Sequence, residues 1–358
     1  MAGNSDRSGG ADGTNRRRML GLGAGLLGLG AVTAGLRPGA AVTGTGSDQN
    51  GDLAAVQQDD TDGCAAMSQW DVSLAETTAD WNTRSSASRY CSVPCETTEG
   101  TALERGQQIR IAADDASGGF PDAVYTIVST HEGTAVRLTQ GGLERIGASD
   151  SAAATLGGRA VHPSYDTREL GRYNDEYVEY LVGEDDETTD VFAMAPHGGF
   201  VEYGTDFQAE RVANLRGDLA WICAGFNDGG GAYSRWHVPS TEINRRSFPL
   251  LDGLSDQPGD WAVSFHGYAD ETVFVGGTAS EADRQLVAEE ISARIDGVDV
   301  VLASGDATDY DGAAPTNILN ESAPVGRTIQ IEQPSGVRQR QWRAVADGVV
   351  SGLETLLE

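Results

Sequence analysis

The hydrophobic residues of the second half of the chain fall into short continuous runs separated by polar, periodic segments. Runs such as 191–195 and 261–265 have the length and composition of strands buried on both faces. In 280–295 and 342–356 the hydrophobic residues recur at spacings of three and four, which predicts helices with one buried face. Strands that alternate with helices predict an α/β domain over residues 173–358, with a mixed central sheet covered by helices on both faces.

The preceding residues show a different pattern. Short apolar segments separated by turns that contain Gly and Asp predict a small β-rich module over residues 101–172, with one of its strands at 143–146. Residues 45–100 have little apolar periodicity and are rich in Asp, Thr, Ser and Gly, so they are predicted to form an acidic polar linker. A short helix is expected at 174–181, where the α/β domain begins.

Residues 1–44 have the features of an export signal. Arg16, Arg17 and Arg18 precede a segment rich in Gly, Ala and Leu that ends near Leu36, as in a twin-arginine signal. The segment is short and glycine-rich for a membrane-spanning helix, although retention as an anchor is the alternative. We therefore expect a secreted, extracellular protein with no stable membrane partner after the signal is removed.

The four cysteines are interpreted in that context. In an exported protein the default is disulfide chemistry, and Cys64 paired with Cys91 or Cys95 would cross-link the linker. A zinc site built from these three cysteines would lack a fourth ligand. Cys223 lies in an apolar run and is expected to be a small core residue.

The charge balance limits the partners. The chain has 25 basic and 54 acidic residues, a net charge of −29, and arginine but no lysine. Such a surface argues against nucleic-acid binding, which needs a basic footprint. It suits concentrated salt, where the Debye length falls to about 3 Å at 1 M, so we expect a halophilic source; an acidic secreted protein from ordinary salt is the alternative.

Candidate metal ligands lie at the ends of two apolar runs. His197 ends the first run and is followed by two glycines, and Glu202 comes five residues later. A His and a carboxylate on one tight loop are two of the three protein ligands that a catalytic zinc needs. His266 ends the second run in the same way and is the best third ligand. The alternatives are a structural loop for the first pair and a core histidine for His266.

A candidate general base lies near the end of the chain. Residues 328–332 alternate polar and apolar side chains, so Gln330 and Glu332 share one face of a strand. A carboxylate beside a zinc-activated water suits a general base. The alternative for Glu332 is an ion pair with Arg327 or Arg338.

In their order along the chain these motifs resemble the poly-gamma-glutamate hydrolase family, which are zinc peptidases with a carboxypeptidase-like fold. The resemblance covers roughly residues 173–340. The matching pieces are His197–Glu202, Trp221–Gly225, Trp236–Thr241, Val263–Gly267, Val275–Gly277, Asn317–Asn320 and Gln330–Glu332. The resemblance implies one Zn²⁺ per chain, a metal-activated water with Glu332 as base, and cleavage of γ-glutamyl amide bonds in poly-γ-glutamate or a related anionic polymer.

The resemblance also implies a substrate-binding region at Asn317 and Asn320, where related zinc peptidases grip a carboxylate with Asn and Arg. The family pattern expects Arg directly after the second Asn, and this chain has Glu321. Four arginines are candidate substitutes: Arg327, Arg338, Arg245 and Arg246. The predicted substrate-binding set is Asn317, Asn320, Gln330, His237 and Arg327.

His237 lies in the matching segment Trp236–Thr241. It is predicted to contact either the substrate or a metal ligand. Two other functions stay open. The zinc centre would act on another amide of a cell-surface polymer, or the protein would be an exported binding module without turnover.

Overall fold

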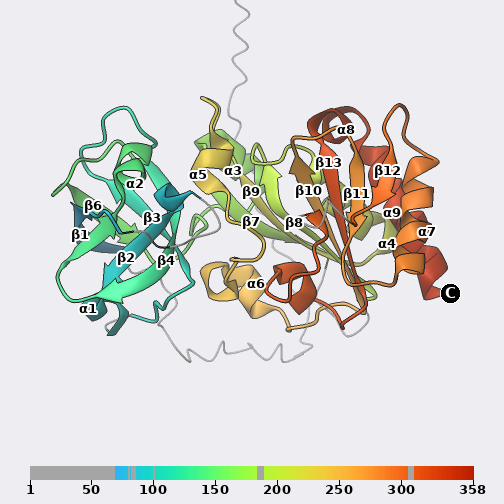
Figure 1. The fold of residues 1–358 in the computed structure, drawn as a ribbon, viewed down its shortest axis with the longest axis horizontal. Coiled ribbons are helices and arrows are strands. Elements are labelled where there is room, and N and C mark those ends of the chain that lie inside the picture. Colours follow the sequence, from blue (N-terminus) through green and yellow to red (C-terminus); the bar gives the residue numbers. More distant parts are fainter. Residues whose placement is uncertain (1–68, 80, 82–85, 100, 184–188, 305–309) are drawn as a thin grey trace, which may run out of the picture. The chain divides into compact units, whose positions relative to one another are not determined.

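The computed structural model describes residues 69–358 except 80, 82–85, 100, 184–188 and 305–309. The described strands form a closed barrel, β1 to β6, and a seven-stranded sheet, β7 to β13 (Figure 1). The predicted export signal, residues 1–44, and Cys64 lie outside the described residues. Within the described residues, no helix has both the length and the apolar character needed to cross a membrane.

The barrel has the strand order β1-β5-β2-β4-β3-β6. Its interior is filled by alternate side chains of the strands, among them Leu74, Ile111, Tyr125 and Leu156, all at most 1% exposed. Its elements are β1 (Gln69–Glu76), η1 (Ala87–Arg89), β2 (Tyr90–Pro94), α1 (Cys95–Glu99), β3 (Gln108–Ala113), β4 (Asp122–His131), β5 (Ala135–Leu138), α2 (Gln140–Arg145) and β6 (Ala153–Gly157).

The barrel differs from the predicted module in two ways. Its strands β1 and β2 come from residues 45–100, which were predicted to be a linker. In β1, Trp70, Val72 and Leu74 alternate with polar residues, as in a half-buried strand. The strand predicted at 143–146 is instead part of helix α2, because Thr139 Oγ1 accepts a hydrogen bond from Gly142 N and caps the helix. The described cysteines, Cys91, Cys95 and Cys223, are free.

The sheet has the order β12-β11-β13-β10-β8-β9-β7. Strands β13, β10, β8 and β9 are parallel, whereas β11 and β7 run antiparallel to their neighbours β13 and β9. The elements are α3 (Arg168–Asn174), β7 (Tyr177–Val182), β8 (Val191–Gly199), α4 (Thr205–Arg216), β9 (Leu219–Gly225), α5 (Ala232–Trp236), η2 (Arg245–Ser247), α6 (Pro249–Gly253), β10 (Trp261–Tyr268), β11 (Val273–Gly276), α7 (Glu281–Ser292), β12 (Val300–Leu302), η4 (Ile318–Glu321), β13 (Thr328–Pro334), α8 (Ser335–Arg340) and α9 (Trp342–Leu357).

The predicted helix at 174–181 does not form. Helix α3 ends at Asn174, and Asp175 adopts a left-handed conformation at φ 57° that turns the chain into β7. The aromatic and β-branched residues Tyr177 and Val178 then lie buried in a strand, as their β propensity favours. The predicted helices at 280–295 and 342–356 correspond to α7 and α9.

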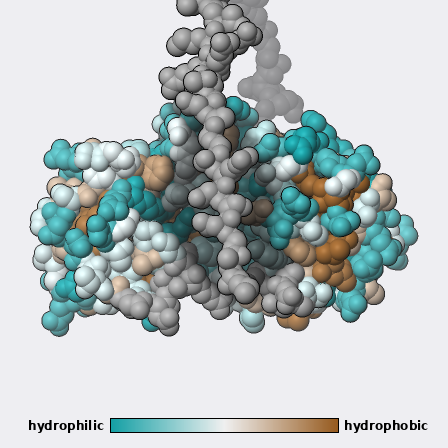
Figure 2. Space-filling model, turned by 45° about the horizontal axis from the view of Figure 1, so that its top comes forward, coloured by the Kyte–Doolittle hydropathy of each residue, from teal (hydrophilic) through white to brown (hydrophobic). Residues whose placement is uncertain are grey.

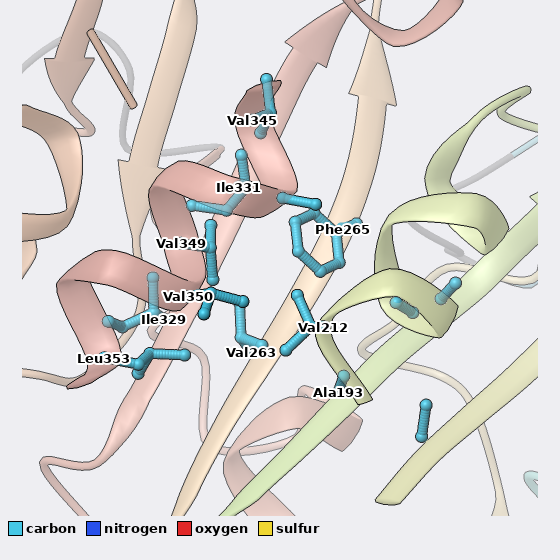
Figure 3. Close-up of a cluster of buried hydrophobic side chains, with 14 of the residues drawn as sticks. Ala193, Val212, Val263, Phe265, Ile329, Ile331, Val345, Val349, Val350 and Leu353 are labelled. Carbon is cyan, nitrogen blue, oxygen red and sulfur yellow. The ribbon is translucent and has the colours of Figure 1, made fainter. Parts of the chain in front are cut away.

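Helices cover both faces of the sheet. Successive side chains of a strand point to opposite sides, and the apolar residues on each side are buried under helices. On one face Ala193, Val263 and Ile329 pack against Val212 of α4 and Val349 of α9 (Figure 3). On the other face a second set packs against α5, α6 and η4; it includes Phe192, Met194, Trp221, Trp236, Leu251 and Leu319. The predicted mixed α/β fold with helices on both faces is confirmed. Figure 2 shows a mostly hydrophilic surface over the described residues that it exposes to view.

The sheet topology determines where a site can lie. Because β8, β10 and β13 are parallel neighbours, their carboxyl ends meet at one edge of the sheet, which is the usual place for ligands in α/β folds. His197, His266 and Glu332 lie at these ends.

Candidate metal centre

The end of β8 is shaped to present His197. The register of β8 against β9 shifts between Ala195 and Gly198, and such a bulge re-aims a side chain. Gly199 then takes φ 69°, and a Cβ there would lie 2.7 Å from the Gly225 carbonyl oxygen, so only glycine fits the turn. The chain returns at once, because Glu202 N donates a 2.8 Å hydrogen bond to the His197 carbonyl.

Three side chains converge beyond this turn. The Nδ1 atom of His197 lies 3.1 Å from Glu202 Oε1 and 3.1 Å from His266 Nδ1. His266 Nδ1 lies 3.5 Å from Glu202 Oε2. Ligand atoms about 2.0–2.1 Å from a tetrahedral zinc lie about 3.3 Å from one another. The three observed separations therefore fit those between ligand atoms that share a divalent cation.

The hydrogen bonds behind the imidazoles support the same conclusion. His197 Nε2 donates to the Val238 carbonyl at 2.7 Å, which leaves a lone pair on Nδ1 when the ring is neutral. His266 Nε2 lies 2.8 Å from Ser264 Oγ, so its Nδ1 also faces inward. A proton between the two Nδ1 atoms satisfies one of them, whereas a divalent cation satisfies both nitrogens and the carboxylate. The residues present thus fit a zinc ion.

His237 lies at the edge of this cluster. Its Nε2 is 3.9 Å from Glu202 Oε1, and its ring centroid is 4.3 Å from that of His197. His197, Glu202 and His237 also satisfy the distances of a metal site, with ligand atoms within 4.8 Å of one another. We favour His266 as the third ligand because its Nδ1 is closer to the Glu202 carboxylate, at 3.5 Å, and lies 3.1 Å from His197 Nδ1. Burial and the neighbouring His197 hold the pKa of His237 well below its usual range.

Glu332 is held beside the centre by a chain of amides. The strand register pairs it with His266, so both side chains lie on the same face of the sheet. Gln330 Nε2 donates to Glu332 Oε1 at 3.1 Å, and Asn317 Nδ2 donates to Gln330 Oε1 at 3.0 Å. Asn317 and Gln330 therefore line the pocket, but their side chains orient Glu332.

The two buried carboxylates have opposite pKa shifts. Burial raises the pKa of Glu332 to about 8, and Glu202 adds to this effect while His266 and Arg338 oppose it. Burial also acts on Glu202, but the charge and hydrogen bonds of His197 and His266 outweigh it and hold the pKa of Glu202 well below its usual range. Carboxylates whose pKa values are pushed apart suit different tasks: a lowered pKa suits an anionic ligand, as at Glu202, and a raised pKa suits a proton carrier, as at Glu332.

Two residues of the predicted substrate-binding set lie elsewhere. Asn320 donates to the Gly312 and Ala314 carbonyls and so anchors a loop instead of facing the pocket. Arg327 precedes the first residue of β13, at the opposite end of the strand from Glu332, and its guanidinium stacks on Trp261 with Cζ 4.9 Å from the ring centroid. The sequence pattern did not distinguish one end of the strand from the other.

Sequence reasoning did not identify the groups that orient the ligands. The Val238 carbonyl and Ser264 hydroxyl have no signature of their own, although Val238 lies in the matching segment Trp236–Thr241 and Ser264 lies two residues before His266. Arg338 is one of the four arginines that are candidates for binding a substrate carboxylate. It lines the pocket that contains the metal centre.

Comparisons with known proteins place about half of the chain in a family. A model of the family described as poly-gamma-glutamate hydrolase matches residues 165–346, half of the chain. The UPF0714 protein YndL of Bacillus subtilis strain 168 is 29% identical over 177 residues, and the SPbeta prophage-derived UPF0714 protein YoqZ of the same strain is 31% identical over 171 residues. These alignments cover 49% and 47% of this chain, and 65% and 57% of the relatives. The chain thus spans less than two thirds of the length of either relative.

Two solved structures are similar to part of the chain. A bacteriophage poly-gamma-glutamate hydrolase matches with a TM-score of 0.43 and 23% identity, over 51% of this chain and 89% of that protein. Zinc-free YndL matches with a TM-score of 0.41 and 22% identity, over 52% of this chain and 92% of that protein.

Proposed function

Because the chain belongs to the poly-gamma-glutamate hydrolase family, we propose that it hydrolyses the γ-linked amide bonds of poly-γ-glutamate with one zinc ion held by His197, Glu202 and His266. The observation that carries the proposal is the 3.1 Å contact between the two Nδ1 atoms beside the Glu202 carboxylate. Three inward lone-pair donors at one point are the arrangement that a catalytic zinc requires.

A zinc ion bound there would supply Lewis-acid polarisation of the scissile carbonyl and lower the pKa of water from about 15.7 toward about 7. Glu332 takes a proton from the attacking water and passes it to the leaving nitrogen. Burial raises the pKa of Glu332, which favours transfer of an accepted proton onward to the leaving nitrogen.

The surrounding hydrogen bonds keep these groups in position. The Val238 carbonyl fixes the proton of His197 on Nε2, and Gln330 orients the Glu332 carboxylate. Such supporting contacts typically contribute about 10–100-fold in metal affinity or activity.

We also propose that the protein acts outside the cell after twin-arginine export, in concentrated salt. The paired arginines Arg17 and Arg18 and the net charge of −29 support this location. Replacing both arginines with lysine should leave the precursor inside the cell, as detected by immunoblot of cells and medium. Unchanged release of the double variant would contradict the export route.

The function is tested by measuring the chain length of poly-γ-glutamate after incubation with the purified zinc-loaded protein in molar salt. We expect shortening that stops when a chelator is added and returns with added zinc. Unchanged polymer, from folded protein that carries one zinc per chain, would contradict the proposal and direct the search to other amides of cell-surface polymers.

A further inference from the structure

The pocket that contains the metal centre has one arginine among its described lining residues. It encloses about 800 Å³, and its lining residues include Glu202, His266, Glu332, Tyr268 and Arg338. A polyanionic substrate that enters a protein with a net charge of −29 needs a local cation. Arg338 is the described side chain of the pocket that offers a permanent one.

Arg338 is fixed in place but keeps part of its guanidinium available. Its Nη1 donates to the Tyr203 carbonyl at 2.8 Å and its Nε to the Gln333 carbonyl at 3.3 Å. The residue is only 8% exposed, yet Nη2 has no hydrogen-bond partner and no carboxylate within 4.0 Å among the described residues. Glu202 and Glu332 act on this guanidinium only from beyond ion-pair distance, so it is suited to receive a closer anion from a ligand.

The backbone beneath Arg338 is adapted to its position. A Cβ on Gly267 would lie 2.3 Å from both Cζ and Nε of Arg338, so the guanidinium lies directly against β10. Gly267 N in turn donates to the ligand carboxylate of Glu202 at 2.8 Å. The guanidinium therefore lies against Gly267, the residue that follows His266 and donates to Glu202. From there it would contact the part of a substrate next to the scissile bond.

The other candidate arginines are used elsewhere. Arg327 lies at the opposite end of β13, as described above. Arg245 Nη2 donates to three carbonyls, those of Leu251, Leu254 and Ser255, and Arg246 pairs with Glu104 at 3.0 Å. Both border a different cleft.

We propose that Arg338 binds the free α-carboxylate on the leaving-amine side of the scissile bond and thereby selects γ-linked over α-linked glutamate. This inference rests on the proposed function. In a γ-linked chain, the carbon that bears the scissile nitrogen also carries a free carboxylate. Within an α-linked chain that carboxyl group is consumed in the next amide bond. A guanidinium fork recognises a carboxylate through paired hydrogen bonds, so it discriminates between the two linkages next to the reacting atoms.

The test combines two substrates with three variants. The substrates are a γ-linked glutamate oligomer and the same oligomer with its α-carboxylates converted to carboxamides. The variants are Arg338→Met, Arg338→Lys and, as a matched control on the exposed side of the same helix α8, Arg340→Met. Zinc content is measured for each protein, so that loss of metal is separated from loss of recognition.

We expect Arg338→Met to lower kcat/KM for the carboxylate oligomer by about 10–100-fold, as for loss of a charge-assisted pair, with little change for the carboxamide. Arg338→Lys should keep part of the preference, and Arg340→Met all of it. A purely structural role predicts an equal loss on both substrates, and that result would overturn the proposal. If Arg338→Met does not fold, the wild type decides, because equal rates on the two oligomers would equally overturn it.

A separate measurement distinguishes failure of this inference from failure of the proposed function. If the wild type cleaves neither oligomer, the hydrolase proposal fails, and Arg338 is tested by calorimetry of L-glutamate binding to the zinc-loaded proteins. Binding at least 10-fold weaker in Arg338→Met or Arg338→Lys than in Arg340→Met supports a carboxylate site. Equal binding rejects it.

Discussion

Two buried polar clusters of this molecule are built on opposite principles. The first, here called the charged network, joins Arg110 and Asp122 of the barrel to Glu176 and Arg235 of the α/β domain. Asp122 pairs with both arginines, and Arg110 also pairs with Glu176 at 2.6 Å. Charges alternate in sign throughout this network, although Arg110 Nη1 has no hydrogen-bond partner among the described residues.

The metal centre has the reverse arrangement. His197, Glu202 and His266 place two imidazole nitrogens and a carboxylate within 3.5 Å of one another, and Arg338 has no anion within ion-pair distance among the described residues. A paired network contributes to the fold whether or not a ligand is present, whereas a cluster with like groups facing each other is stabilised by a cation. The two clusters thus differ in that the buried groups of the charged network pair with one another, whereas those of the metal centre are suited to a bound cation.

The largest expected effect comes from removing a lone-pair donor. His266→Ala leaves two of the three proposed ligands, so we expect zinc content to fall from one per chain to a small fraction and hydrolysis to be lost. Ser264→Ala is the matched comparison, because it keeps the imidazole and removes the closer of the two hydroxyls that contact His266 Nε2, those of Ser264 and Ser240. It should cost about 10–100-fold in zinc affinity. Zinc titration and polymer cleavage of both variants check the prediction.

The result also decides between the two possible ligand sets. Full zinc content in His266→Ala would contradict its assignment as the third ligand and favour His237, which lies 3.9 Å from Glu202 Oε1. In that case His237→Ala, not His266→Ala, would release the metal.

The second effect separates catalysis from metal binding. Glu332→Gln keeps the shape of the side chain and removes its proton-carrying group, so kcat should fall by about 10²–10⁴-fold with zinc retained. Glu321→Gln, in the other cleft, serves as the control and should leave kcat unchanged. Steady-state cleavage together with metal analysis measures both quantities. Activity of Glu332→Gln close to the wild type would exclude Glu332 as the general base.

The parts of the fold that sequence predicts best are those with a strong local period. Helix α9 repeats Val345, Val349 and Leu353 on one stripe, and all three are buried as expected. Strand β1 was missed because only Trp70, Val72 and Leu74 carry its signal, and they are completed by barrel partners far along the chain. The strand conformation of β1 thus depends on pairing with β5 and β6 more than on local composition.

The candidate site shows the same division. His197 and His266 follow apolar runs, so the parallel sheet brings them together without further information. No local pattern places the Val238 carbonyl behind His197 or directs Arg338 from α8 back over Gly267. These contacts depend on how loops and helices pack after the sheet has formed.

The third effect tests the charged network. Asp122→Asn leaves Glu176 as the ion-pair partner of Arg110 and removes the ion pair of Arg235 with Asp122, so it should destabilise the protein by about 3–5 kcal/mol, as for breaking a buried ion pair. Glu104→Gln is the control, because its pair with Arg246 is more than half exposed and should be worth about 0–1 kcal/mol. Denaturant unfolding of both variants provides the comparison, and equal free energies of unfolding would contradict it.

The smallest effect is the pH dependence of that difference. Burial opposes ionisation of Asp122, but Arg110 and Arg235 outweigh it and hold its pKa below the usual value. A lowered pKa gives stability that is present above the ordinary value of about 3.9 and is lost as the pH falls through the lower folded value. The difference in unfolding free energy between wild type and Asp122→Asn should therefore be constant near neutrality and shrink in acid by at most about 1.4 kcal/mol per pH unit.

The sign of this dependence is specific to Asp122. Burial raises the pKa of its neighbour Glu176 above the usual value, despite Arg110. The contribution of Glu176 to the free energy of unfolding therefore has the opposite sign, and it makes the protein less stable as the pH rises. Denaturant titrations of wild type and Asp122→Asn at several pH values between about 2 and 7 measure the contribution of Asp122 together with the change it causes in Glu176, whose pKa the Asp122 charge also raises. A difference that grows in acid would mean that the arginines do not hold the ionised form of Asp122, and the charged network would then differ less from the metal centre than the structure indicates.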